Sequence, residues 1–383
     1  MYNYIPLEQA ADILDSYRKP VNSKERLNLI KGKPLDELFP YYGATGQVGW
    51  IDSFLTDGEY ILLGEDGAPF LNPYAEKAYI IYGKTWVNNH AHILRSKTNN
   101  EFLCYYLNYF NYKNYVSGTT RLKLTQAQMR KIPIPNIPSD EQSRIVASIE
   151  ELFSELDKAV GTLKTTKEQL EVYRQTILVE AFRAATNSTY LKVGCVCAKI
   201  VDCPHSTPKW EKSGKLCLRT TNFKRGYLDL QSPNYVSEET FNDRNRRIIP
   251  QPGDVLYSRE GSVLGIACTI PSNVYPCLGQ RMMLLRSGEK LNNRYLMHYL
   301  NSPMVTNHVI ATKGGTGSPH INVGDIKEFQ IPIPSLEEQS NIVRQIEEQL
   351  SSCDNVEKTV DSILTQADAM RQSILKQAFE GTL

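Results

Sequence analysis

The chain has 383 residues and a net charge of only +1, with 43 Lys and Arg against 42 Asp and Glu. This length allows two or three domains with separate cores. The balanced charge excludes a surface that is basic throughout, so any nucleic-acid-binding surface must be local. The sequence contains no run of 18 apolar residues and no charged-then-apolar leader, which predicts a soluble, cytoplasmic protein. Its eight cysteines are irregularly spaced, and we expect them to be reduced thiols.

Residues 1–136 are predicted to form a first body of mixed α/β structure. The stretch 17–33 holds six Lys or Arg and one acid, and suits either a solvated face or an edge that contacts phosphates. In 39–50, paired aromatic residues stand beside Gly-rich polar residues, which suits a hairpin turn or a loop that approaches a partner closely. Strand-like segments follow at 59–63, 78–82 and 91–95, and a short aromatic helix at 102–110.

Residues 137–186 and residues 335–383 are each predicted to form a long helix, because one segment occurs twice. Residues 141–182 and 338–379 align without a gap over 42 positions. Their apolar residues recur at alternating spacings of three and four, which is typical of a coiled-coil seam. Candidate capping boxes precede both copies, at Ser139 with Gln142 and at Ser335 with Glu338. The simplest arrangement pairs the two helices antiparallel within one chain, and a coil between two chains is the alternative.

Residues 187–334 are predicted to form a second body that shares the fold of the first but not its surface. Short motifs recur in the same order: 65–67 resembles 259–261, 89–95 resembles 280–286, and 118–135 resembles 317–334. Each body ends in Ile-Pro-Ile-Pro, and the link from there to the helix is two residues longer in the first copy. Between His205 and Arg259, ten Lys or Arg and six acids are interleaved with aromatic residues, which suits either a solvated face or a DNA groove.

Signatures of catalysis and metal binding are missing from the sequence. The Gly-rich stretch 314–317 lacks the Lys of a phosphate-binding loop, and 72–74 lacks one proline of an amino-methyltransferase tetrapeptide. A zinc site is only weakly indicated, because its candidate ligands lack paired Cys-x-x-Cys spacing; they are Cys195, Cys197, Cys203 and His205. We therefore expect no catalytic, cofactor-binding or metal site, and a chain that is not itself an enzyme.

The order of these segments resembles the specificity subunit of a type I restriction-modification system. The resemblance covers the whole chain and rests on the two Ile-Pro and Glu-Gln helix starts and on Gln-Ala-Phe-Glu-Gly at 377–381. It implies an α+β fold in which two α/β target recognition domains are separated by two long antiparallel coiled-coil helices, with a pseudo-twofold internal repeat. Each domain would read one half of a bipartite, asymmetric DNA site, and the helices would set the spacer.

The resemblance also implies partners and leaves other classes open. The partners would be double-stranded DNA, two modification (methyltransferase) subunits and motor-nuclease restriction subunits, with no membrane. S-adenosylmethionine, ATP and magnesium would belong to those subunits, and this chain would hold no cofactor. The alternatives are the recognition subunit of a related two-part methyltransferase/nuclease system, a non-catalytic coiled-coil adaptor, and a self-contained enzyme.

Candidate DNA-contacting residues are polar, basic and aromatic residues in the presumed loops of each body, because base edges and phosphates are contacted by such side chains. In the first body they are Tyr41, Tyr42, Thr45, Gln47, Asn88, Asn89 and His90, with Thr119, Thr120 and Arg121 toward phosphates. In the second body they are Lys209, Trp210, Arg219, Asn222, Lys224, Arg259, Gln280, Arg281, Lys313, Thr316, Ser318 and His320.

Overall fold

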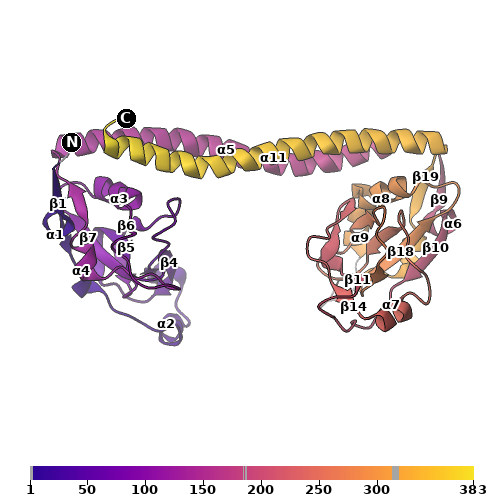
Figure 1. The fold of residues 1–383 in the computed structure, drawn as a ribbon, viewed down its shortest axis with the longest axis horizontal. Helices are drawn as coiled ribbons and strands as arrows, with labels where there is room; N and C mark the ends of the chain where they lie inside the picture. Colours follow the sequence, from indigo (N-terminus) through magenta and orange to yellow (C-terminus); the bar gives the residue numbers. More distant parts are fainter. Residues whose placement is uncertain (1–2, 184, 186–187, 313–318) are drawn as a thin grey trace. The chain divides into compact units, whose positions relative to one another are not determined.

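The computed structural model describes residues 3–183, 185, 188–312 and 319–383, which divide into two compact units (Figure 1). Unit 1 consists of Met1–Lys164 and Val360–Leu383, and unit 2 of Thr165–Thr359. Two long helices, α5 (Ser139–Arg183) and α11 (Leu336–Glu380), each contribute residues to both units. Each unit therefore contains one body and one stretch of each long helix. No helix in the described part of the chain is long and apolar enough to cross a membrane.

The two long helices pack against each other in opposite directions within each unit. In unit 1 the first half of α5 meets the end of α11, where Arg371 forms an ion pair with Asp157 and its guanidinium lies 4.9 Å from the ring centre of Phe153. In unit 2 the end of α5 meets the first half of α11, where Arg174 lies 2.6 Å from Asp354 and 2.9 Å from Glu357. The predicted antiparallel pairing within one chain is confirmed.

The apolar stripe of the helices is not buried along its whole length. Ile149 and Ile374 lie in the core of unit 1, and Ile177 and Ile346 in the core of unit 2. Other apolar side chains of the stripe remain exposed, namely Leu152, Tyr173, Val356, Ile363 and Met370. Two helices alone do not cover the stripe, which leaves apolar surface on the helix pair of each unit.

The body of unit 1 is built on a mixed sheet. All neighbouring strands are antiparallel except β6 and β3, which are parallel, and β3 and β4 form a hairpin at one edge. Its six strands lie in the order β2-β7-β5-β6-β3-β4. Their bounds are β2 Ala11–Ile13, β3 Phe39–Gly43, β4 Gly46–Ile51, β5 Thr56–Gly64, β6 Ala78–Val87 and β7 Ala91–Ser96. A separate pair joins β1 (Tyr4–Pro6) to β8 (Pro133–Pro135). Helices α1 (Leu7–Ala10), α2 (Ser23–Ile30), α3 (Asn100–Tyr109) and α4 (Gln126–Met129) and the 3₁₀ turns Asp15–Tyr17 and Leu35–Glu37 complete the body.

The body of unit 2 contains a four-stranded sheet of order β10-β18-β15-β16. These strands are β10 Cys197–Asp202, β15 Val255–Ser258, β16 Ala267–Thr269 and β18 Met282–Ser287. Smaller sheets are formed by β9 (Thr189–Lys192) with β19 (Gln330–Ile333), by β11 (Lys215–Leu218) with β14 (Tyr235–Val236) and β17 (Cys277–Leu278), and by β12 (Phe223–Lys224) with β13 (Tyr227–Leu228). Its helices are α6 (Val193–Val196), α7 (Glu238–Arg244), α8 (Asn293–Asn301), α9 (Pro303–Thr312) and α10 (Val323–Lys327), with a 3₁₀ turn at Thr220–Asn222.

The two bodies share one scaffold. The order β10-β18-β15-β16 repeats β2-β7-β5-β6, and all of these pairings are antiparallel. In both bodies an asparagine at the end of a helix exchanges two hydrogen bonds with the backbone of a strand alanine: Asn108 with Ala78, and Asn301 with Ala267. In Figure 1 the equivalent helices α3 and α8 each lie between the sheet of their own body and the long helices. The expected common fold is confirmed.

The bodies differ by what lies between their first and second sheet strands. Residues 14–55 connect β2 to β5 and form α2, β3 and β4, whereas residues 203–254 connect β10 to β15 and form β11 to β14 and α7. Both insertions occupy the same place in the topology, and each adds one parallel strand, β3 on β6 or β11 on β17, with an antiparallel partner, β4 or β14. Their remaining elements differ, since only the second insertion contains the β12–β13 hairpin and α7. A repeated scaffold thus carries two unlike surfaces.

Equivalent positions of the two copies lie 197 residues apart, both in the last strand of each body and at the start of each long helix. Tyr106 donates to the Pro133 carbonyl and Tyr299 to the Gln330 carbonyl, and α5 and α11 begin 197 residues apart, at Ser139 and Leu336. The two Ile-Pro-Ile-Pro motifs, however, lie 199 residues apart. The link from the tetrapeptide to the helix is therefore two residues longer in the first copy, as expected, because the tetrapeptides occupy different positions along equivalent strands.

The Glu-Gln pair at each helix start owes its role to the glutamine. Gln142 donates to the Ile137 carbonyl at 3.0 Å, and Gln339 donates to the carbonyls of Pro334 and Lys290 at 2.9 Å. Both side chains are buried, and each also accepts a hydrogen bond from its body, from the Thr98 hydroxyl and from the Asn292 amide. Each glutamine therefore fastens a long helix to its body.

Only one of the two expected capping boxes is present. The Ser335 backbone amide donates to Glu338, and the Glu338 amide donates to the Ser335 hydroxyl, as a capping box requires. The box expected from Ser139 and Gln142 is wrong, because Ser139 lies inside the first turn of α5 and Gln142 is engaged with the body.

Candidate nucleic-acid interface

Three loops meet beside the sheet of the first body. They are the turn 65–67 after β5, the loop 88–90 before β7, and the loop 117–123. Backbone hydrogen bonds join them: the Glu65 amide donates to the His90 carbonyl, the Leu124 amide to the Glu65 carbonyl, and the Gly67 amide to the Leu122 carbonyl. Loops joined in this way hold their side chains at fixed places on one surface.

The second body repeats this junction with other residues. The Arg259 amide donates to the Arg281 carbonyl, the Ile321 amide to the Arg259 carbonyl, and the Gly261 amide to the Pro319 carbonyl. Arg259 thus takes the backbone position of Glu65, and Arg281 that of His90. The same three-loop frame presents an acid and an imidazole in one body and two guanidinium groups in the other.

Charged side chains in the first body cluster on the turn after β5. His90 Nδ1 lies 2.6 Å from Asp66, and Arg121 donates to the same carboxylate at 2.9 Å. Neighbouring Glu65 pairs with Arg18 at 2.5 Å and with Lys123 at 3.1 Å. Burial acts to raise the pKa of Glu65, but the hydrogen bonds from Arg18 and Lys123 outweigh it and hold this pKa below its ordinary value.

A surface hollow of about 580 Å³ opens beside the loop 88–90 of the first body. Its lining joins four candidate residues to a segment outside the candidate list, and consists of Pro20, Val21, Asn22, Ser23, Arg26, Tyr41, Val48, Asn88, Asn89 and His90. The segment 20–26 leads into α2 and belongs to the basic stretch 17–33. The charge of that stretch was the signal that could have placed it in the site.

Several expected first-body residues support the surface instead of lying on it. Tyr41 is buried, its hydroxyl donates to the Val21 carbonyl, and the Arg26 guanidinium lies 5.1 Å from its ring centre. Tyr42 is half-buried against Tyr79, and burial raises the pKa of its hydroxyl. Asn88 is buried and accepts the His90 amide. Of the two alternatives for 39–50, the hairpin is confirmed, because β3 and β4 pair antiparallel, and Tyr41 and Tyr42 lie on β3 and not in an open loop.

The remaining first-body candidates lie at the surface. Exposed side chains are those of Thr45, Gln47, Asn89, Thr119, Thr120 and Arg121. Thr45 lies in the turn between β3 and β4, and Gln47 donates to the Gly49 carbonyl at 3.1 Å. Polar side chains from β4 and from two loops are therefore available to an approaching partner.

A smaller hollow of about 110 Å³ gathers four expected residues of the second body. It is lined by Trp210, Arg219, Gln280 and Arg281 together with Thr207, Thr220 and Thr221. The Arg219 guanidinium lies 5.4 Å from the ring centre of Trp210, and the Thr207 hydroxyl donates to Gln280. An aromatic face, an amide and two guanidinium groups in one hollow can contact both base edges and phosphates.

Three expected second-body residues are placed otherwise. Arg259 is only 8% exposed and binds Asp202 through two hydrogen bonds of 2.8 and 3.0 Å. Asn222 is buried and holds its own turn, accepting the Arg219 amide and donating to the Asp229 carbonyl. Lys224 lies in the β12–β13 hairpin beside α5 and α11 of unit 2, away from the hollow. Arg259 and Asn222 are thus engaged inside the body and Lys224 lies beside the long helices, and their contact with DNA stays a prediction.

The other second-body candidates are only partly described. Lys209 is exposed, and His320 is half-buried in a bridge to Glu260. Lys313, Thr316 and Ser318 lie outside the described residues.

The weakly indicated zinc site is not formed. Cys203 is buried, Cys195 is exposed, and His205 lies 3.2 Å from Asp202. Among the residues that the structure describes, no group of three or more His, Cys, Asp or Glu is placed to hold a metal ion.

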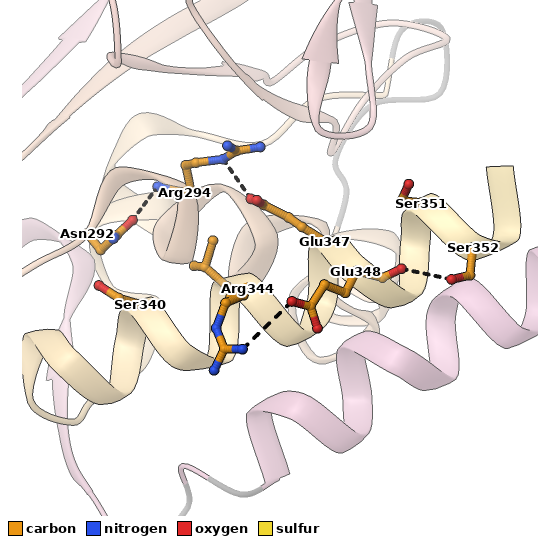
Figure 2. A pocket seen from close by; sticks show the side chains of 9 residues that line it. Asn292, Arg294, Ser340, Arg344, Glu347, Glu348, Ser351 and Ser352 are labelled. Atoms are coloured by element: carbon orange, nitrogen blue, oxygen red, sulfur yellow. Dashed lines mark hydrogen bonds and ion pairs between the residues drawn. The ribbon is translucent and has the colours of Figure 1, made fainter. Parts of the chain in front are cut away.

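Another hollow of about 670 Å³ lies where α8 meets α11 in unit 2. Figure 2 shows Arg294 reaching Glu347 from α8 and Arg344 reaching Glu348 along α11, at 2.6 and 3.7 Å. Its charges neutralise one another, and it lies on the helices and not at the three-loop junction. This hollow is therefore separate from the candidate interface.

Comparison with known proteins identifies the repeat. A family model described as the type I restriction modification DNA specificity domain matches residues 9–172 and again residues 203–365. A putative type I restriction enzyme specificity subunit of Haemophilus influenzae is 28% identical over 350 residues, which cover 88% of this chain and 85% of the relative. The EcoKI specificity subunit of Escherichia coli K12 is 24% identical over 74% of this chain and 65% of the relative.

Solved structures agree in fold. A chain from a structure of the assembly and conformational transition of the type I R-M system matches with a TM-score of 0.70 and 19% identity, covering 100% of this chain and 98% of its own. The HsdS subunit of Thermoanaerobacter tengcongensis matches with a TM-score of 0.55 and 20% identity, covering 100% and 97%. Since the family model accounts for most of the sequence in two copies, the chain belongs to the type I restriction-modification DNA specificity family.

Proposed function

We propose that this chain is the DNA-recognition subunit of a type I restriction-modification complex, and that each body reads one half of a bipartite DNA site. The observation that carries the proposal is the three-loop junction, which occurs in both bodies on one scaffold but with different side chains. A shared frame gives both bodies the same way of approaching DNA. Different side chains give them different base preferences, so the recognised sequence is asymmetric.

The chemistry of each junction suits DNA. Basic side chains surround it, including Arg18, Lys123 and Arg121 in the first body and Arg219 and Arg281 in the second. Phosphate contacts orient a protein on the duplex, whereas amide and guanidinium groups distinguish base edges in the major groove.

The long helices would serve as the spacer between the half-sites. Each contains 45 residues, which at about 1.5 Å per residue makes a rod of roughly 68 Å. Two half-sites one helical turn apart lie about 34 Å from each other along DNA. Base pairs between them would remain unread, and the packed helix pair would fix their number.

Partner subunits would dock on the helices and bodies. The exposed apolar residues Leu152, Tyr173, Val356, Ile363 and Met370 offer helical surface for two modification subunits. Motor-nuclease restriction subunits would join the same complex. S-adenosylmethionine would bind the modification subunits, and ATP and magnesium the restriction subunits, so that this chain supplies sequence recognition while its partners supply the chemistry.

Methylation mapping tests the proposal. The chain is co-expressed with its modification subunit, and plasmid DNA from these cells is analysed by long-read sequencing that detects methylated adenine. We expect one split, asymmetric motif with a methylated adenine in each half. A complex that assembles but binds DNA without salt dependence and methylates no motif would favour the adaptor class.

A further inference from the structure

The two bodies share a turn made of an acid followed by glycine. Asp66-Gly67 follows β5, and Glu260-Gly261 follows β15 at the same distance from the strand end. Gly67 and Gly261 have φ values of +73° and +88°, in the left-handed region that favours glycine. Both turns are fixed by backbone hydrogen bonds from the glycine amides to Leu122 and Pro319. This acid–glycine turn is therefore a rigid part of the repeated frame.

Each turn carries one guanidinium group. Arg121 lies 2.9 Å from Asp66, and Arg281 lies 3.5 Å from Glu260. A Cβ atom added to Gly67 would lie 3.3 Å from Arg121 Nε, and one added to Gly261 would lie 3.6 Å from Arg281 Nη1. Both guanidinium groups thus lie against the glycine of the turn. They reach it from different loops, since Arg121 belongs to 117–123 and Arg281 precedes β18.

These pairs are poorly explained as devices for stability. The side chains of Arg121 and Arg281 are 62% and 49% exposed, and ion pairs between exposed groups contribute little. Arg281 also has a φ of +68°, an unusual backbone conformation for a residue with a side chain. Arg259, one strand away, shows the contrast, because it is buried and bound twice by Asp202.

One acid contact leaves most of an arginine's hydrogen-bonding capacity unused. A guanidinium group has five N–H donors in a fixed plane; Asp66 accepts one of those of Arg121, and Glu260 lies 3.5 Å from Nε of Arg281. Guanine presents two acceptors, O6 and N7, in the major groove, and a planar guanidinium pairs with both at once. A phosphate can also be bound by the point charge of a lysine, whereas the two acceptors of guanine require the planar fork.

We propose that Arg121 and Arg281 each read one guanine, Arg121 in the half-site of the first body and Arg281 in that of the second. Asp66 and Glu260 are positioning residues that orient the two arginines. This inference rests on the proposed function and deepens it, since it names a base and a residue in each half-site. It replaces the phosphate role expected for Arg121 from the sequence.

The test uses the assembled complex and the motif mapped for the wild-type chain. We expect Arg281→Gln to lose preference for guanine at one position of one half-site by roughly 5- to 150-fold, and Arg121→Gln to do so at one position of the other. Arg246→Gln and Arg130→Gln, two exposed arginines that also hold single ion pairs, serve as matched controls and leave the motif unchanged.

Modified DNA separates base reading from phosphate contact. Replacing the mapped guanine by 7-deazaguanine removes the N7 acceptor, so it weakens binding by the wild-type complex but not by the Arg281→Gln complex. Arg281→Lys keeps the positive charge but lacks the planar guanidinium group. If the Arg281→Gln complex fails to assemble, the same binding measurements on the Arg281→Lys complex distinguish base reading from phosphate contact. Equal weakening of all sequences, with recovery by lysine, would overturn the inference. A wild-type complex without any motif would instead refute the proposed function.

Discussion

Burial divides the arginines of the second body into a structural and an exposed group. Arg244 is buried and donates to the carbonyls of Leu278, Gly279 and Ser206, so it fixes the backbone that leads to Arg281. Arg259 is equally committed to Asp202. A charge enclosed in this way is held by its partners and cannot turn toward a ligand without leaving them unpaired.

Arg259→Ala should therefore reduce stability and leave the recognised sequence unchanged. Its loss leaves the Asp202 carboxylate, which is 20% exposed, without its main partner, at a cost of about 2–3 kcal/mol. Thermal unfolding followed by circular dichroism measures the effect. Arg246→Ala, an exposed control, should change stability by no more than about 0.5 kcal/mol. Unchanged stability together with relaxed recognition at one base would show that Arg259 reads DNA.

The Glu65 cluster should make the first body sensitive to acid. The pKa of Glu65 is lowered in the folded state. As the pH falls, the folded protein therefore binds fewer protons than the unfolded chain does. The stabilisation is complete above the ordinary pKa of 4.5 and is lost as the pH falls below it. Glu65→Gln should lower the unfolding midpoint at pH 7, and this difference from wild type should shrink toward pH 3. A constant difference across that range, or the same loss for Glu8→Gln, would contradict the prediction.

The residue types in the sequence indicated which kinds of side chain line the hollow, but not which individual residues lie there. Trp210, Arg219, Gln280 and Arg281 do gather in one hollow, although they come from segments some 60 residues apart. Asn222 and Arg259 are also polar, but Asn222 is hydrogen-bonded within its own turn and Arg259 is paired with Asp202. Tertiary packing decides which of these side chains are buried and which groups they bond, and residue type alone does not predict either.

At the level of elements, the glutamine in each helix start is a structural device. Gln339 bridges the carbonyls of Pro334 and Lys290 and the amide of Asn292, and so ties α11 to the start of α8. The pattern Glu-Gln is visible in the sequence twice, but only the structure shows that both glutamines are buried, that Glu338 caps its helix and that Glu141 is half-buried.

Gln339→Ala should loosen the junction between helix and body. It leaves two carbonyls and one amide without partners, which costs about 1–3 kcal/mol. Hydrogen exchange should accelerate at 288–296 in the second body and stay unchanged in the first. Glu337→Ala, an exposed neighbour in the same turn, is the control. Equal exchange in both variants would mean that packing alone holds the junction.

The elements themselves were predictable to different degrees. Heptad spacing and the gapless repeat predicted two equal helices, and both contain 45 residues. The segments 59–63, 78–82 and 91–95 do form β5, β6 and β7. The hairpin alternative for 39–50 is confirmed by β3 and β4, but the strands on either side of the turn were not predicted, because their Gly and aromatic content conceals the alternation that identifies a strand.

At the scale of the whole molecule, the proposed spacer role makes a prediction about the gap between the half-sites. Four residues are inserted after Thr162 in α5 and after Gln366 in α11, which keeps the helices paired. The insertion adds about 6 Å and turns the following helix by about 40°. We expect the gap in the methylated motif to change, or methylation to stop, while the folded content of the chain remains as measured by circular dichroism.

A seven-residue insertion at the same two places is the matched control. It adds two turns of a coiled coil, about 10.5 Å, and restores the rotational phase of the seam. Since DNA rises about 3.4 Å per base pair, the gap should lengthen by about three base pairs while both half-sites keep their sequences. An unchanged gap in both insertion variants would show that the helices do not set the spacing and that contacts made by partner subunits do.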